Sequence, residues 1–171
     1  MKSKIFFIQI MLIISAISAG ITIGAADNTT DYLTIDVSGT IESQIISYTI
    51  NDFEEIEVEI DGDSYCTIQL GSESQIKEKD APDLPNIRRS ILIPNDQKMH
   101  IEIISSNYQE YDNVMIAPSK GILKRTIDPT TVDYHFGESY TKNAWYPETT
   151  AFLEDPYVLR DYRGQVVVIN P

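Results

Sequence analysis

Few residues of this 171-residue chain could serve as a nucleophile or a base. It contains one cysteine, Cys66, and two histidines, His100 and His135. A cysteine nucleophile needs a histidine that holds it as the thiolate, and neither histidine lies in a recognisable catalytic context. Cys66 alternates with Tyr65 and Thr67 inside a predicted strand, so we expect a buried, unreactive thiol. These residues do not predict a catalytic centre.

The carboxylates of Asp61 and Asp63 could form a calcium-binding pair. The further acidic and amide ligands that a calcium loop needs are missing downstream at the required spacing. Asp61 is followed by Gly62, and Asp-Gly is a preferred sequence for a two-residue hairpin turn. We therefore predict a hairpin turn here, and we expect no metal or cofactor.

The net charge limits the classes of partner. The chain has 13 basic and 26 acidic residues, which gives a formal charge of −13. Nucleic-acid affinity depends on Lys and Arg that neutralise phosphates, and anionic membranes attract basic segments. We expect neither partner, whereas a basic protein surface or simple solubility fits an acidic chain.

The first 26 residues have the organisation of a secretory signal peptide. Lys2 and Lys4 precede a mainly apolar run over residues 5–17, and small residues follow up to Ala26, the expected cleavage site. Cleavage there would remove two lysines and no acidic residue, and so leave a net charge of −15. A secreted or cell-surface protein without a stable membrane anchor follows from this interpretation.

A signal anchor that stays in the membrane is the alternative. The apolar stretch through Ile23 approaches the roughly 20 residues that span a bilayer, but the glycines and small residues before Asp27 favour cleavage. The rest of the chain, residues 27–171, has the size of one domain. Asn28 begins a glycosylation triplet, whose use depends on the host.

Short apolar runs closed by Pro, Asn, Asp or Gly predict an all-β domain. The clearest alternation covers residues 53–60, where Ile56, Val58 and Ile60 should face inward and three glutamates outward. No segment has a convincing helical period. We expect a jelly-roll-like sandwich of two antiparallel sheets. The expected strands are residues 33–37, 41–50, 53–60, 63–70, 91–93, 99–105, 108–116, 132–136, 157–162 and 165–169, the last two as a hairpin around Arg163-Gly164.

Several proline-bounded motifs together resemble the N-terminal propeptide of gingipain-type cysteine peptidases. Each motif is weak, and their order and spacing over roughly residues 32–171 carry the similarity. The motifs are Ala81-Pro82-Asp83-Leu84-Pro85, Ile91-Leu92-Ile93-Pro94, Ile116-Ala117-Pro118, Tyr146-Pro147, and Arg163-Gly164 with Val167-Val168-Ile169-Asn170-Pro171.

The resemblance implies a precursor with a signal peptide, a β-sandwich propeptide and a catalytic domain with a His/Cys dyad. The propeptide would assist folding and keep the peptidase latent until cleaved, and its partner would be the catalytic domain, in cis, C-terminal to Pro171. Both dyad members lie downstream of the propeptide in the family, so Cys66 and His135 are not the dyad and this chain is not itself an enzyme. Because the chain stops just after the strand-like residues 166–169, we expect the front part of a longer polypeptide.

Family enzymes typically cut after Arg or Lys, so a basic residue of the propeptide should occupy the specificity pocket. The first candidate is Lys124-Arg125, in a loop that Pro118 and Pro129 stiffen. The rivals are Arg88, Arg89, Arg160 and Arg163.

Two other functions stay open at this point. The chain could be a free-standing β-sandwich for adhesion or carbohydrate binding, or a peptidase inhibitor that acts in trans. Five aromatic residues would form the binding face of the former: Tyr134, Tyr140, Trp145, Tyr146 and Tyr157.

Overall fold

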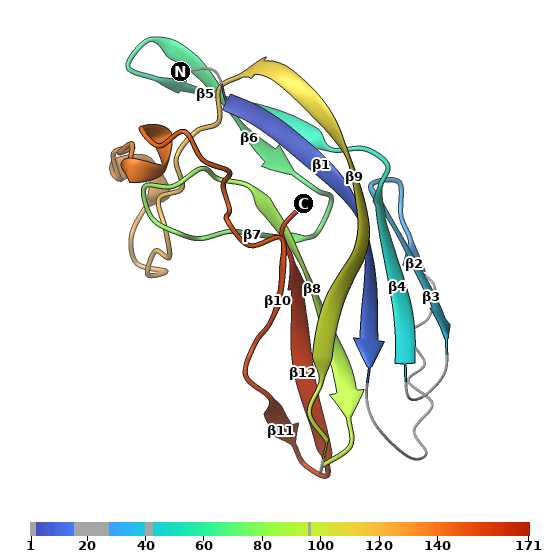
Figure 1. Ribbon diagram of the computed structural model, residues 1–171. Helices are drawn as coiled ribbons and strands as arrows, with labels where there is room; N and C mark the ends of the chain where they lie inside the picture. The colour runs from blue at the N-terminus through green and yellow to red at the C-terminus, as the bar shows by residue number, and fades with distance from the viewer. Residues whose placement is uncertain (1–2, 16–27, 40–42, 96) are drawn as a thin grey trace.

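The chain folds as a β-sandwich in which two sheets face each other, with a hairpin and an irregular lobe at one end (Figure 1). This is a computed structural model, and it describes residues 3–15, 28–39, 43–95 and 97–171. The lobe comprises residues 115–150 and contains two 3-10 turns, η1 (Pro129–Thr131) and η2 (Glu138–Tyr140). All pairings between the strands are antiparallel, so the predicted all-β sandwich is confirmed.

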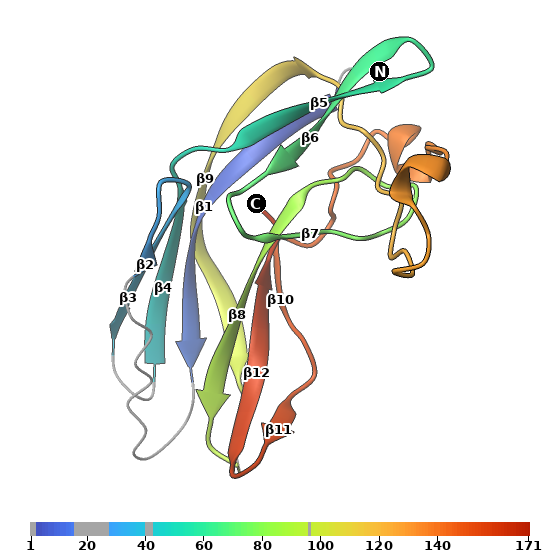
Figure 2. The ribbon, with the colours of Figure 1, turned by 180° about the vertical axis from the view of Figure 1, so that it is seen from behind.

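Each sheet is assembled from strands that are distant in sequence. The first sheet, in spatial order, contains β2 (Asn28–Thr29), β3 (Leu33–Gly39), β4 (Ser43–Ile50), β1 (Ser3–Ser15) and β9 (His100–Val114). The second contains β10 (Ala151–Leu153), β12 (Tyr162–Ile169), β8 (Pro85–Ile93) and β7 (Ser74–Gln75), with β11 (Tyr157–Leu159) also paired to β12. Figure 2 shows the same two layers from behind.

The core lies between the two sheets. Ile46 and Tyr48 of β4 meet Ile87 of β8 and Ile169 of β12 in one buried cluster. Burial alternates along β4, because successive side chains of a strand point to opposite faces. Each fully buried apolar side chain stabilises the fold by about 1.5–3 kcal/mol.

The expected Asp-Gly hairpin is present. β5 (Glu54–Ile60) and β6 (Asp63–Gln69) pair with each other, and Ile60 lies opposite Asp63. Asp61 and Gly62 both have positive φ angles, 54° and 89°, as a type I′ turn requires. The prediction that Ile56 faces inward is wrong: it is 39% exposed, whereas Ile60 is buried. The hairpin is a separate two-stranded sheet. It reaches a core near its open end through Ile68 of β6, which is fully buried against Ile116, and Ile56 lies outside that cluster.

Part of the predicted signal segment lies in a sheet. Ser3–Ser15 forms β1 and pairs with β4 on one side and β9 on the other. The expected cleavage site, Ala26, lies outside the described residues. In the part of the chain that the structure describes, no helix has the length and apolar character needed to cross a membrane.

Three predicted strand boundaries are wrong. Residues 99–105 and 108–116 do not form two strands, because pairing with β1 holds residues 100–114 in one strand with two local register shifts. Residues 132–136 form no strand and connect η1 to η2. The final hairpin turns at Arg160, whose φ is 56°, and Gly164 lies within β12 opposite Tyr157.

Candidate functional site

The base of the Lys124-Arg125 loop is fixed to the rest of the protein by backbone hydrogen bonds. The amide of Ser119 donates to the carbonyl of Ala81 at 2.7 Å, and the amide of Asp80 donates to the carbonyl of Ser119 at 2.9 Å. Ser119 is buried. Gly121 follows with a φ of +74°, which is the left-handed region that glycine adopts without strain. The chain is thereby turned outward into residues 121–127, which we call the basic loop.

The Lys120 side chain closes the basic loop across its base. Its Nζ donates a hydrogen bond to the carbonyl of Pro129 at 2.7 Å and lies 3.9 Å from the centroid of the Tyr134 ring. On the same side, Asp128 accepts hydrogen bonds from the amide and the hydroxyl of Thr130. These bonds to the charged form lower the pKa of Asp128. Both ends of the loop are therefore held before any partner binds.

The tip of the basic loop presents two unpaired cations. Lys124 and Arg125 are exposed, and the amide of Ile127 donates to the carbonyl of Lys124 at 2.9 Å to form a turn. Within the described residues, neither cationic side chain has a hydrogen bond or ion pair. Ile122, in the same loop, is 84% exposed. This tip can enter a partner without first breaking an internal contact.

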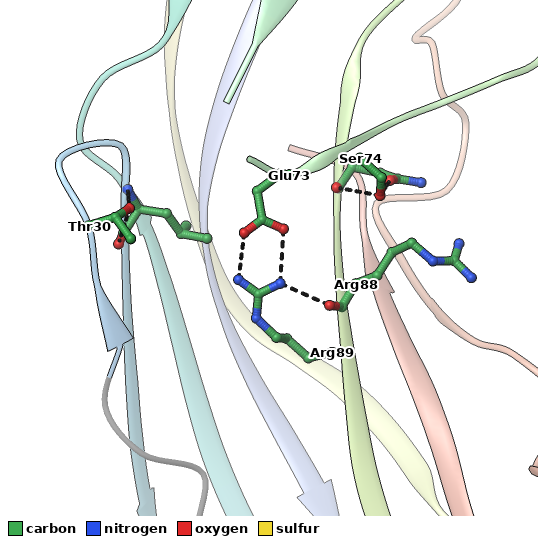
Figure 3. Close-up of polar contacts among 7 residues, drawn as sticks. Thr30, Glu73, Ser74, Arg88 and Arg89 are labelled. Atoms are coloured by element: carbon green, nitrogen blue, oxygen red, sulfur yellow. Dashed lines mark hydrogen bonds and ion pairs between the residues drawn. The ribbon is translucent and has the colours of Figure 1, made fainter. Parts of the chain in front are cut away.

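Arg89 is held inside the protein by a two-pronged ion pair. Its Nη1 and Nη2 lie 2.9 Å and 2.6 Å from the two carboxylate oxygens of Glu73 (Figure 3). Nη1 also donates to the carbonyl of Arg88 at 2.8 Å. The hydrogen bonds to Glu73 raise the pKa of Arg89. Burial beside this pair raises the pKa of Tyr48 to about 12. Arg89 is therefore a structural residue.

The other candidate arginines differ in how many hydrogen bonds and ion pairs they make within the protein. Arg88 forms an ion pair with Glu154. Arg163 donates to two backbone carbonyls, those of Asn95 and Gln97, at 3.0 Å and 2.6 Å. Arg160 is exposed in the turn between β11 and β12, at the far end of the second sheet from the lobe (Figures 1 and 2). Only Lys124 and Arg125 combine exposure with a loop that is closed at its base.

Cys66 does not form a reactive centre. It is half-buried rather than fully buried, and its backbone bonds to Met115 and Ala117 at 2.8 Å each. Burial, with a smaller contribution from the carboxylate of Glu55, raises the pKa of the thiol to about 11. Across the described residues, no three His, Cys, Asp or Glu side chains are grouped so that they could hold a metal.

The five aromatic residues considered for carbohydrate binding do not share one face. Tyr134 lies under Lys120, Tyr140 donates to a backbone carbonyl at 3.1 Å, and Tyr146 donates to a carboxylate. Trp145 is exposed. Tyr157 lies on β11, at the other end of the second sheet (Figure 1). The lobe uses most of these rings for its own packing.

The residues that shape the basic loop were not among the predicted site residues. Ser119, Lys120 and Asp128 act through contacts with Ala81, Pro129 and Thr130. The dipeptide Asp128-Pro129 could have predicted the turn that closes the loop, because Asp before Pro favours the start of a turn or helix. The contact between residues 80–81 and 119 had no sequence signal, because nearly 40 residues separate them.

Known proteins resemble this chain over most of its length. A family described as Propeptide_C25 matches residues 33–171. Gingipain R1 of Porphyromonas gingivalis is 44% identical over 96 residues, which are 56% of this chain and 10% of that protein. Gingipain R2 of strain W83 is 42% identical over 96 residues, 56% of this chain and 13% of that protein. The chain therefore corresponds to a small part of these relatives.

Two solved structures have the same fold. One is the complex of Porphyromonas gingivalis RgpB pro- and mature domains, with a TM-score of 0.74, 30% identity, and coverage of 80% of this chain and 72% of that chain. The other concerns the zymogenic latency of gingipain K from Porphyromonas gingivalis, with a TM-score of 0.71 and 17% identity over 85% of this chain and 84% of that chain.

Proposed function

Because this chain belongs to the Propeptide_C25 family, as its motif order predicted, we propose that it assists the folding of a gingipain-type cysteine endopeptidase and keeps that enzyme latent until it is cleaved away. The chain is the propeptide and not the peptidase. Its partner is the catalytic domain, in cis, C-terminal to Pro171. A standard interface of about 1,600 Å² would hold the two together.

The observation that carries the inhibitory mechanism is the unpaired dibasic tip of a loop with a fixed base. A peptidase that cuts after Arg or Lys needs acidic or carbonyl groups in its specificity pocket. Arg125, or its neighbour Lys124, fills that pocket and makes charge-assisted hydrogen bonds there. The contacts of Ser119 and Lys120 hold the loop before binding, so little conformational entropy is lost on association.

Inhibition of mature gingipain R1 tests this mechanism. We expect Arg125→Ala to raise the inhibition constant of the propeptide about tenfold or more, because a desolvated charge pair is lost. Lys124→Ala should have a smaller effect. Arg88→Ala is the control, since Arg88 is already paired with Glu154, and Arg160→Ala tests the exposed rival.

The result also identifies the inhibitory residue. A larger loss for Lys124→Ala than for Arg125→Ala would assign the specificity pocket to Lys124. Unchanged inhibition constants for both variants would exclude the basic loop, and a loss confined to Arg160→Ala would move the inhibitory contact to the β11–β12 turn.

The chain reaches its site of action by secretion, with residues 1–26 as a cleaved signal peptide. The basic n-region, the apolar run and the small residues before Asp27 support this route. The mature propeptide is then secreted or at the cell surface.

A further inference from the structure

A pocket of about 730 Å³ opens in the lobe beside the basic loop. One wall comes from residues 76–81, before β8, and the other from residues 137–149, which comprise η2 and the segment that leads to β10. These two segments lie side by side at the lobe end of the second sheet (Figures 1 and 2). Nothing in the inhibitory mechanism above uses this pocket.

The pocket and the basic loop share one backbone segment. The amide of Asp80 bonds to Ser119 at the base of the loop, and the carbonyl of Asp80 accepts a 2.7 Å hydrogen bond from the amide of Gly137. A Cβ on Gly137 would lie 2.7 Å from that carbonyl oxygen, so a side chain there would separate the walls. From the same segment, the Cβ of Lys79 would lie 3.0 Å from a Cβ added to Gly121. The pocket wall and the base of the basic loop are therefore joined through residues 79–80.

Acidic side chains dominate the charge of the pocket. Four carboxylates line it: Glu78, Asp80, Glu138 and Glu148. Lys142 lies 3.1 Å from Glu138 and neutralises it, and Lys79 is the other cation of the lining. The remaining excess of negative charge favours a positively charged ligand.

The aromatic wall adds a second, independent feature that suits a cation. Trp145 and Tyr146 line the pocket together with Pro147, and Trp145 is 62% exposed. The Tyr146 hydroxyl donates to Glu78 at 3.1 Å, which fixes the ring next to a carboxylate. Burial and the charge of Glu78 raise the pKa of Tyr146, so it remains a donor. A ring face beside carboxylates binds Lys and Arg side chains through cation–π attraction and ion pairing.

A third feature is an unsatisfied polar atom in the wall. Ser139 is one of the lining residues, and its hydroxyl oxygen is shielded from solvent and has no hydrogen-bond partner among the described residues. Native proteins rarely leave such a group unpaired. A guanidinium or ammonium group offers several donors at once, and one of them can satisfy this oxygen after a small movement of the wall.

We propose that this pocket binds one Lys or Arg side chain from the surface of the mature peptidase domain, beside the cleft that receives the basic loop. This inference rests on the proposed function, because it gives the same partner a second anchor. Glu78 and Glu148 supply the charge, and Trp145 supplies the ring face. The acidic pocket then contacts a basic side chain of the partner, and the basic loop enters the adjacent cleft. Two neighbouring contacts of opposite charge fix the orientation of the partner.

Binding of the full propeptide to mature gingipain R1 tests the second anchor. The variants are Trp145→Ala and Glu148→Gln, whose side chains are exposed, so we expect both to fold normally and to melt at the wild-type temperature. Each should raise the dissociation constant about fivefold to tenfold, in line with the loss of a partly exposed cation–π or charge contact. Glu102→Gln, an exposed acidic residue of β9, is the charge-matched control and should bind like wild type.

The same variants in an Arg125→Ala background separate the two proposals. The binding free energy lost at the pocket should add to that lost at the basic loop, since the two contacts are distinct. If the propeptide does not bind gingipain R1 at all, the proposed function fails first. If binding and its Arg125 dependence are intact while Trp145→Ala and Glu148→Gln bind like wild type, the second anchor is overturned and the proposed function stands.

Discussion

Arg88 and Arg89 are neighbours on β8, yet they have different roles because they point to opposite sides of the strand. Figure 3 shows Arg89 extending toward Glu73 and Arg88 extending away from it. The Arg89 and Glu73 side chains are only 30% and 16% exposed, whereas Arg88 and Glu154 are 39% and 37% exposed. Loss of one partner from a mostly buried pair leaves an uncompensated charge.

We therefore expect Arg89→Ala to lower the free energy of unfolding by about 2 kcal/mol, the usual cost of a lost hydrogen-bonded charge contact. Arg88→Ala should cost less than about 0.5 kcal/mol, because exposed ion pairs contribute little. Urea denaturation of the two variants gives the comparison. Equal losses for both would contradict the structural role assigned to the Arg89–Glu73 pair.

Cys66 gives a pH-dependent prediction at the same scale. Its pKa is about 11 in the folded protein against an ordinary value near 9. A raised folded-state pKa means that the protonated thiol stabilises the fold below pH 9 and that this stabilisation is lost as the pH rises toward 11. The native protein should react slowly with iodoacetamide at pH 8, and the rate should rise up to about pH 11. The urea-unfolded chain should reach half its maximal rate about two pH units lower.

At the scale of elements, the basic loop depends on the closure made by Lys120. Its Nζ joins the start of the loop to Pro129 and contacts the Tyr134 ring. Without that closure the loop samples more conformations, and part of the binding free energy is spent on ordering it. Lys124 and Arg125 keep their charges in this case, so any loss of inhibition comes from loop order.

We expect Lys120→Met, which keeps the apolar stem but removes the ammonium group, to be cut by trypsin after Lys124 or Arg125 several times faster than wild type. Its inhibition constant should rise while the melting temperature stays within a few degrees. Lys142→Met, which removes the exposed ion pair of η2, is the matched control for cleavage in this loop. Wild-type cleavage rates in Lys120→Met would show that the loop is ordered by other contacts.

At the scale of the whole molecule, the N-terminal segment and the sandwich are linked. β1 lies between β4 and β9 in the first sheet, and it is part of the segment that we propose is removed on secretion. Its removal takes away the backbone partners of one edge of β4 and one edge of β9. β8 and β12 pair with each other in the second sheet and keep their partners.

Two measurements on the secreted protein test this link. Its N-terminal sequence should begin at Asp27, and its β4 and β9 amides should exchange hydrogen faster than those of the unprocessed precursor. The amides of β8 and β12 should exchange at similar rates in both forms. A secreted chain that still begins at Met1 would rule out cleavage and make β1 a permanent strand of the sheet.

Local chemistry explains what could be predicted from the sequence. The turn at Asp61-Gly62 was predictable because its two residues themselves favour positive φ. The position of Ile56 was not, because exposure depends on whether another element covers the hairpin. Similarly, residues 100–114 form one strand only because β1 pairs along them.

The all-β class, the Asp-Gly hairpin, the dibasic pair and the order of motifs that identifies the family follow from the amino-acid sequence alone. These properties depend on neighbouring residues or on their order along the chain. Which of the basic side chains are free of internal contacts, and where the acidic pocket lies, depend on the folded arrangement of the chain. Arg89 meets Glu73 across 16 residues, and the two walls of the pocket lie about 60 residues apart in the chain. Such contacts depend on how the sheets and the lobe pack, and packing brings together residues that no local pattern relates.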